Sequence, residues 1–567
     1  MKKVLSLFFI LAFALPLWAE KQNCKISSER PVKLLAAEMN RSFKTLKKLN
    51  PPVYYMSYTY TDAVYRSVYV QYGGVSSRRG FFYPQMDVQV RVGSPEMDNT
   101  RKLKNSQDDY SVVRGGMPAL EGDGTSFMRA VWWLTQKAVE RAQQDYGRVQ
   151  ADVQGASQRM DDSPDFVFPA ISSYCFTREV PSFDWDALEK TLLKVSRQVQ
   201  GNPVVLDSDF SFSATLGHRY FVDSRGTRLK QPIIDFRVQY SLYGKTADGL
   251  ELERGQIYNI VSAEDIPTEA ALSAAVAESV KELETLYRAP LAEPITAPTI
   301  LKNRAMGVFV HEVLGHRMEG HRQKEDSFGR TFTSKLGQQV TAPFISVLDD
   351  ATLQSFNGEP LRGFYEYDDE GVKSQPVVMI ENGVLKNFLM SSSPIKGFPV
   401  SNGHGRRGDG KRAVARMGNT RVVASETVSY DELEKMLVEE IKRQGKPYGF
   451  IIDDLSGGFT MTDTNSPQVF KLKPRYVYRV YPDGRKEVIR GVDIVGTPLV
   501  SFSQIIAAAD DDAVFNGNCG AESGWVPVSA IAPSVLLKTL EIEHTAKSAV
   551  KPPILPPPDA VKKGGKK

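Results

Sequence analysis

Cysteine is scarce in this chain of 567 residues, which contains only Cys24, Cys175 and Cys519. So low a count excludes a small scaffold held together by disulfides. An odd number also leaves at least one thiol outside any intrachain bridge. Cys24 and Cys175 are simply interpreted either as a disulfide or as two buried thiols. Cys519 then needs an explanation of its own.

The chain also lacks a strong bias of charge. Its formal net charge is +4, and 41% of its residues are hydrophobic and 24% charged. That composition is ordinary for a globular protein and excludes a fibrous or wholly disordered chain. The positive excess lies in Lys2, Lys3 and the segment after Val550, and the remaining body is slightly acidic. Nucleic-acid binding therefore gains no support from charge.

Long apolar runs are missing apart from one near the start. Lys2 and Lys3 precede an apolar run over residues 4–14, and a Leu-Trp-Ala sequence ends at Ala19. This pattern is typical of a secretory signal peptide over residues 1–19, because the run is shorter than the roughly 20 residues of a bilayer span. Lipidation at Cys24 is disfavoured, since Lys, Gln and Asn precede it. We expect an exported, periplasmic or extracellular protein without an integral membrane segment after signal removal.

The rest of the chain divides into three parts. Residues 20–290 mix alternating, strand-like runs with helical spacing, and we expect a mixed α/β N-terminal region. Residues 291–545 follow a Pro-rich connector and consist mostly of short strand-like runs separated by turns. Residues 546–567 are rich in Pro and Lys and should form a disordered tail. The expected fold class is α+β, with a mixed N-terminal region followed by a strand-rich C-terminal domain that carries a histidine-bearing helix.

That helix contains the pattern with the clearest chemistry. His311-Glu312 follows an apolar lead-in, and His316 comes five residues after His311. Zinc peptidases usually space the two histidines four residues apart, which places both on one helix face. Five steps leave side chains roughly 140° apart on an ideal α-helix. A π-bulge would restore the shared face, and Gly315 would lower its steric cost, so the spacing fits zinc only with a local distortion, for which we expect a π-bulge.

Other interpretations of the histidines remain open. His311, Glu312 and His316 could simply be polar residues on a helix surface. His321 lies a further five residues along the chain and is a rival ligand on spacing grounds.

The segment 403–408 has the glycine spacing of a dinucleotide-binding loop. No strand leads into it and no apolar helix follows, so we interpret it as an ordinary loop.

The sequence resembles the TldD/PmbA family, specifically its active TldD-like branch. Residues 311–320 are similar to the family's HExxxH signature with its trailing Glu-Gly. Further similar stretches follow in the family's order, at 368–371, 380–385, 416–420 and 518–520. The resemblance covers about residues 300–540 and is faint over 205–255. His321 departs from it, because the family usually has Asp there, and an export signal is atypical of the family.

The resemblance implies a metallopeptidase in which Zn²⁺ is bound by the two motif histidines and a distal cysteine, here His311, His316 and Cys519. It also implies an extended or unfolded peptide substrate that reaches the metal through a narrow entry. Members of the family work as dimers, often with a homologue that lacks the zinc motif. This chain has the motif, so it resembles the active subunit of a homodimer or heterodimer.

Such a ligand set leaves the fourth zinc position to water, which is the arrangement of a catalytic site. Glu312 would then act as the general base and pass its proton to the leaving amine. His404, or the neighbouring Arg406 and Arg407, are candidates to hold the oxyanion.

The backbone at Gly457 and Gly458 offers a strand with which a substrate could pair.

Two other functions compete with a peptidase. One is a non-catalytic, metal-binding subunit of an exported complex, although a structural site has no need of Glu312. The other is a zinc amidase that acts on small modified peptides, which would use the same attack by water.

Overall fold

The computed structural model describes residues 22–103, 112–155, 161–177, 181–324, 331–462 and 469–545, together with residues 553, 555 and 558. The expected signal peptide and nearly all of the expected tail lie outside these residues. Within them, no helix is both long enough and apolar enough to cross a membrane.

A nine-stranded sheet forms the base of the molecule, and all of its strands precede residue 261. Its order is β1-β6-β8-β7-β2-β4-β5, with β3 paired to β2 and β9 paired to β8. The long central strands are antiparallel; burial alternates along β8 from Phe236 to Lys245, as in a half-buried strand, whereas β2 is buried continuously from Tyr55 to Tyr60. The strands are β1 (Gln22–Asn23), β2 (Val53–Gln71), β3 (Gly74–Phe82), β4 (Gln85–Val92), β5 (Val113–Gly116), β6 (Ser173–Thr177), β7 (Asp207–Asp223), β8 (Arg228–Lys245) and β9 (Glu251–Ile260).

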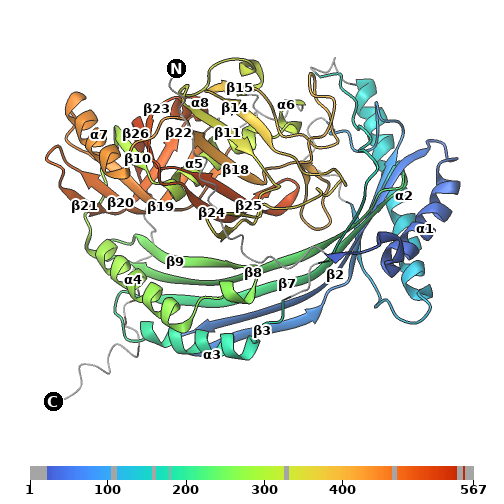
Figure 1. Ribbon diagram of the computed structural model, residues 1–567, viewed down its shortest axis with the longest axis horizontal. Helices are drawn as coiled ribbons and strands as arrows, with labels where there is room; N and C mark the ends of the chain where they lie inside the picture. The colour runs from blue at the N-terminus through green and yellow to red at the C-terminus, as the bar shows by residue number, and fades with distance from the viewer. Residues whose placement is uncertain are drawn as a thin grey trace, which may run out of the picture.

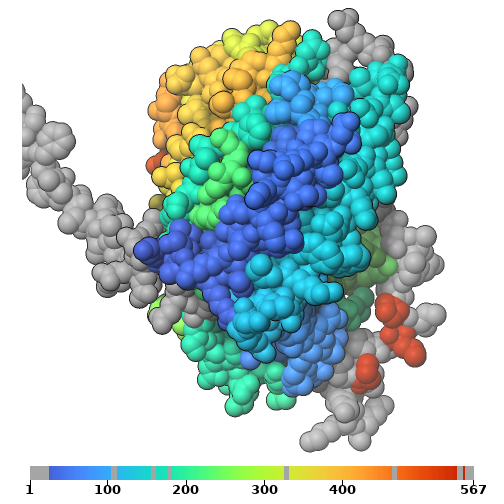
Figure 2. Space-filling view, turned by 90° about the vertical axis from the view of Figure 1, so that its right-hand side faces the viewer, coloured from blue at the N-terminus to red at the C-terminus, as the bar shows by residue number. Residues whose placement is uncertain are grey.

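Two pairs of helices pack at opposite ends of this sheet (Figure 1). The helices α1 (Arg30–Leu46) and α2 (Thr125–Gly155) cover one end, and Figure 2 shows the face that they form. At the other end lie α3 (Trp185–Ser196) and α4 (Glu269–Arg288). Asp184 and Thr268 cap these two helices, because each side chain accepts a hydrogen bond from a first-turn backbone N–H.

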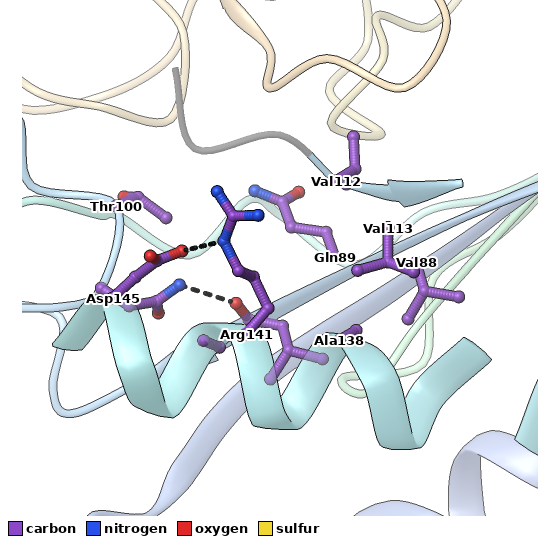
Figure 3. Close-up of a pocket in the computed structure, with 11 residues that line it drawn as sticks. Val88, Gln89, Thr100, Val112, Val113, Ala138, Arg141 and Asp145 are labelled. Carbon is purple, nitrogen blue, oxygen red and sulfur yellow. Dashed lines mark hydrogen bonds and ion pairs between the residues drawn. The ribbon is translucent and has the colours of Figure 1, made fainter. Parts of the chain in front are cut away.

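The contact of α2 with the sheet encloses a small polar hollow (Figure 3). Arg141 and Asp145 pair across one turn of α2, beside Gln89 of β4 and Val113 of β5. None of the expected site residues lines this hollow. We therefore regard it as part of the packing between α2 and the sheet.

Two further sheets follow residue 294 and enclose the predicted helix, α5 (Asn303–Val313). One has the order β10-β19-β20-β22-β26-β23, with β21 paired to β20, and the other has the order β15-β14-β11-β18-β25-β24. The apolar residues of α5 pack between them, which fixes the helix firmly in the core. This arrangement lies over the nine-stranded sheet (Figure 1).

The strands of the two C-terminal sheets are β10 (Ile295–Leu301), β11 (Ile345–Asp349), β14 (Val377–Glu381), β15 (Val384–Leu385), β18 (Asn419–Ala424), β19 (Gly449–Thr460), β20 (Phe470–Val480), β21 (Lys486–Ile489), β22 (Val492–Gly496), β23 (Ile505–Ala508), β24 (Ala513–Ala521), β25 (Gly524–Ala532) and β26 (Val535–His544). The short pairs β12 (Ser355–Phe356) with β13 (Glu359–Pro360), and β16 (Gly405–Arg406) with β17 (Val414–Ala415), lie outside them. The remaining helices are α6 (His321–Lys324), α7 (Tyr430–Arg443) and α8 (Pro498–Phe502). The expected α+β fold class is thereby confirmed, whereas the domain boundaries stay a prediction.

Cys24 and Cys175 form a disulfide, with their Cα atoms 5.4 Å apart. This bond ties β1 to β6 at the edge of the N-terminal sheet. Of the two interpretations of these cysteines, the disulfide is the one that the structure contains. Cys519 is the buried free thiol.

Candidate metal centre

The structure brings together His311, His316 and Cys519 from two distant parts of the chain. The Nε2 atoms of His311 and His316 lie 3.1 and 3.3 Å from the Sγ atom of Cys519. All three potential ligand atoms lie within 4.8 Å of one another. His311 and Cys519 are 208 positions apart, and the contact forms where the end of α5 meets β24.

The two histidines approach each other through a helix end and not through a π-bulge, so that expectation is wrong. The α5 helix stops at Val313, and Leu314 leaves the helical path with φ −112°. A short 3₁₀ helix (Gly315–Met318) then carries His316, and the two imidazole centroids lie 5.0 Å apart. Gly315 has a different role from the one expected, because a Cβ there would lie 2.0 Å from the Sδ atom of Met417.

The electrostatics of the cluster favour a thiolate at Cys519. Burial raises the pKa of the Cys519 thiol, but the His316 and His311 imidazoles outweigh burial and hold it well below its usual value. A thiolate with two imidazole nitrogens is a donor set that suits zinc.

A buried oxygen beside His316 also fits a metal-bound imidazole. The Oε1 atom of Glu319 is fully buried and accepts no hydrogen bond, yet it lies 3.2 Å from Nδ1 of His316. A histidine that binds a metal through Nε2 must present an N–H at Nδ1, commonly to a carboxylate. The residues present therefore fit zinc.

Next to the cluster lies a cavity of about 660 Å³. His311 and Glu312 line it together with residues 453–458 of β19 and 515–518 of β24. The facing wall comes from the N-terminal part, through β9 and α4, which lie below β19 and β24 in Figure 1. A molecule that fills this cavity would therefore contact both parts of the chain.

Glu312 is placed for chemistry in this cavity. Its side chain is buried, and Glu312 and its chain neighbour His311 both line the cavity. A Cβ at Gly458 would lie 2.9 Å from the Cγ methylene of Glu312, so the glycine leaves space for the Glu312 side chain. Gly457 and Gly458 line the same cavity, as a binding strand for substrate requires.

The three candidate oxyanion residues do not lie with the cluster. His404 is fully buried, and its Nε2 lies 3.2 Å from Oδ1 of Asp349. The guanidinium of Arg406 lies over the ring of Tyr365, 4.8 Å from the centroid. Arg407 pairs with Asp87 at 2.6 Å.

These residues serve packing and ion pairs, and none of them lines the cavity beside His311. The rival ligand His321 contacts Glu522 through Nε2 and lies outside the His–Cys cluster.

Sequence reasoning missed two kinds of residue at this site. One is the wall contributed by β9 and α4, which no local motif marks. The other is Arg416, whose guanidinium donates to the carbonyl of Cys519 at 2.8 Å. Arg416 opens the stretch 416–420 that carries part of the family resemblance, which was the only signal available for it.

Known proteins resemble this chain in sequence and in fold. Residues 294–544 match the model of the PmbA/TldA metallopeptidase C-terminal domain. A metalloprotease of Methanocaldococcus jannaschii is 27% identical over 321 residues, which are 56% of this chain and 66% of that protein. A zinc metalloprotease TldD homolog of Saccharolobus solfataricus is 27% identical over 247 residues, 43% of this chain and 51% of that protein.

TldE from Thermococcus kodakarensis has a similar fold, with a TM-score of 0.59 at 14% identity over 89% of this chain and 100% of that one. Residues 294–544 are thus similar to the C-terminal domain of PmbA/TldA metallopeptidases, and the relatives that match carry the names of metalloproteases. The chain spans between about half and two thirds of the length of the curated relatives that it matches.

Proposed function

We propose that the protein is a zinc-dependent metallopeptidase that hydrolyses peptide bonds in extended or unfolded polypeptides. The observation that carries this proposal is the convergence of His311, His316 and Cys519 beside Glu312, at the wall of one cavity. A site that only held a metal for structure would not need a carboxylate that reaches the same cavity. This favours a catalytic subunit over a purely metal-binding one.

The reaction follows from the placement of these residues. His311, His316 and Cys519 would hold zinc, which supplies a Lewis acid that polarises the scissile carbonyl and lowers the pKa of a water molecule. The carboxylate of Glu312 takes a proton from the water as its oxygen attacks the carbonyl carbon. The same carboxyl group then gives the proton to the amine nitrogen as the C–N bond breaks. The products are a carboxylic acid and an amine.

The strand β19 supports an extended substrate. It pairs with β10 only as far as Ile452, opposite Leu301, while β20 pairs along its other edge. Beyond Ile452, no strand in the described part of the chain pairs with the first edge, and residues 453–458 line the cavity there. Unpaired backbone at a strand edge binds an extended peptide with little regard to its sequence.

Two measurements on purified protein test the function. The parent chain should contain about one zinc per chain, and it should cleave a chemically unfolded polypeptide but not the same polypeptide when folded. The variant Glu312→Gln should retain zinc and lose activity by about 10²–10⁴-fold, the contribution of a general base. Hydrolysis of short amides alone would favour the amidase, and zinc without any hydrolysis would favour a non-catalytic subunit.

We further propose that the protein is exported and dimeric. The Cys24–Cys175 disulfide supports an oxidising, extracytoplasmic compartment, because such bonds are rare in the cytosol. A homodimer, or a heterodimer with a homologue that lacks the zinc motif, rests on the family resemblance. Light scattering at micromolar concentration tests it, and a fully active monomer would contradict it.

A further inference from the structure

Arg416 has the largest side chain among the fully buried ones in the part of the chain that the structure describes. A buried guanidinium is costly unless its N–H groups and its charge have partners. Its Nη1 atom donates to the Oγ atom of Ser523 at 2.7 Å and to the carbonyl of Gly524 at 3.0 Å. Its Nη2 atom donates to the carbonyl of Cys519 at 2.8 Å. Arg416 therefore holds the β24–β25 hairpin at three points, one of which is the cysteine of the cluster.

The Nε side of the Arg416 guanidinium faces Glu319, which lies beside His316. Nε of Arg416 lies 3.3 Å from Oε1 of Glu319, the same oxygen that lies 3.2 Å from Nδ1 of His316. The other carboxylate oxygen of Glu319 accepts a 2.7 Å hydrogen bond from Nε of Arg322. Two buried guanidinium groups, those of Arg322 and Arg416, therefore flank the carboxylate of Glu319.

These contacts form a closed ring that includes both His316 and Cys519. The ring runs from the imidazole of His316 to Glu319, on to Arg416, through the carbonyl of Cys519, and from its sulfur back to His316 at 3.3 Å. We propose that Arg416 is a positioning residue that, together with Glu319, fixes His316 and Cys519 relative to each other for metal binding. The inference rests on the metal site of the proposed function, but it concerns the geometry of that site and not the reaction.

A lysine at position 416 separates geometry from charge. It would keep the positive charge but lose the planar fork that reaches the hairpin and Glu319 together. Arg407→Lys is the matched control, because only 9% of the Arg407 side chain is exposed and it pairs with Asp87, away from the cluster. Glu319→Gln is the second variant, since it removes the carboxylate charge while it preserves the shape of the side chain.

The experiment measures Co²⁺ and Zn²⁺ affinity by competition with a chelator, and records the thiolate-to-Co²⁺ charge-transfer band. We expect Arg416→Lys and Glu319→Gln each to weaken affinity by about 10–100-fold, as loss of an outer partner of a metal ligand does. Each should also shift the band, and the double variant should lose far less than the product of the two single losses, because both act through one ring. Arg407→Lys should change neither quantity.

Thermal unfolding of each metal-free variant tests whether that variant is folded. A folded Arg416→Lys variant with the parent's affinity and spectrum would overturn the proposal. If that variant does not fold, an unchanged Glu319→Gln variant overturns it instead. A parent chain that binds Co²⁺ tightly but hydrolyses nothing would refute the proposed function and leave this inference standing.

Discussion

The contact between Gly315 and Met417 yields a quantitative prediction about the metal-binding turn. In Gly315→Ala, the new Cβ would lie 2.0 Å from Sδ and 2.9 Å from Cε of Met417, far inside normal contact. The methionine side chain is flexible, but only 1% of its surface is exposed, so it has little free space into which to move. Overpacking of this kind costs about 1–3 kcal/mol in the free energy of unfolding. We expect that loss, together with weaker metal binding, because His316 is the next residue.

Urea unfolding of the metal-free protein measures the loss, and two further variants isolate its cause. Met417→Ala alone should cost about 2–5 kcal/mol, the usual range for a buried methionine. The double variant should be more stable than the sum of the two single effects predicts, because the shortened side chain makes room for the new methyl group. Gly147→Ala is the control. This glycine lies in α2, where a Cβ meets nothing within 4 Å, so the change should stabilise by up to about 1 kcal/mol. A Gly315→Ala variant as stable as the parent, or strictly additive effects, would refute the reasoning.

Three further predictions follow from other parts of the molecule. Cys519→Ala should lose zinc and activity, and Cys519→Ser should do little better. Cys24→Ala should keep zinc and lose only stability. Metal analysis of the three purified variants tests the zinc content of each. Burial raises the pKa of the Asp98 carboxyl, but the Arg91 guanidinium outweighs it, so the folded pKa lies below the ordinary 3.8. The stability from this pair is therefore complete above that value and is lost as the pH falls through the lower folded pKa, so Asp98→Asn should flatten the acid limb of a stability–pH curve. Finally, mass spectrometry of protein from the cell envelope or medium should find a first residue near Glu20, and an intact cytosolic Met1 form would contradict export.

The sequence allowed the cluster to be anticipated only in part. His311 and His316 could be found locally, because an apolar helix with a His-Glu pair has few other uses. Cys519 could not be joined to them by spacing, since 208 positions separate it from His311; the family resemblance supplied that link. The path between the histidines could not be predicted, because α5 ends where Gly315 must fit against Met417, a residue about a hundred positions away.

The candidate oxyanion residues show the opposite limitation. His404, Arg406 and Arg407 are polar residues that follow one another closely in the sequence and were candidates to hold the oxyanion. Their partners are buried residues from remote parts of the chain, such as Asp349 for His404 and Asp87 for Arg407. Ion pairs of this kind leave no periodic pattern in a sequence. The overall fold was easier, because long alternating strands and amphipathic helices have clear periodicities.

The cavity wall formed by β9 and α4 has a consequence for how the proposed peptidase could diversify. Every residue assigned to metal binding or proton transfer comes from the C-terminal part, whereas the N-terminal part supplies only surface that faces them. Substitutions on that surface, such as at Gln256 or Glu278, would change which polypeptides enter without altering a single ligand of the metal. Substrate selectivity could therefore change in duplicated copies of the gene while the metal site and its reaction stay the same.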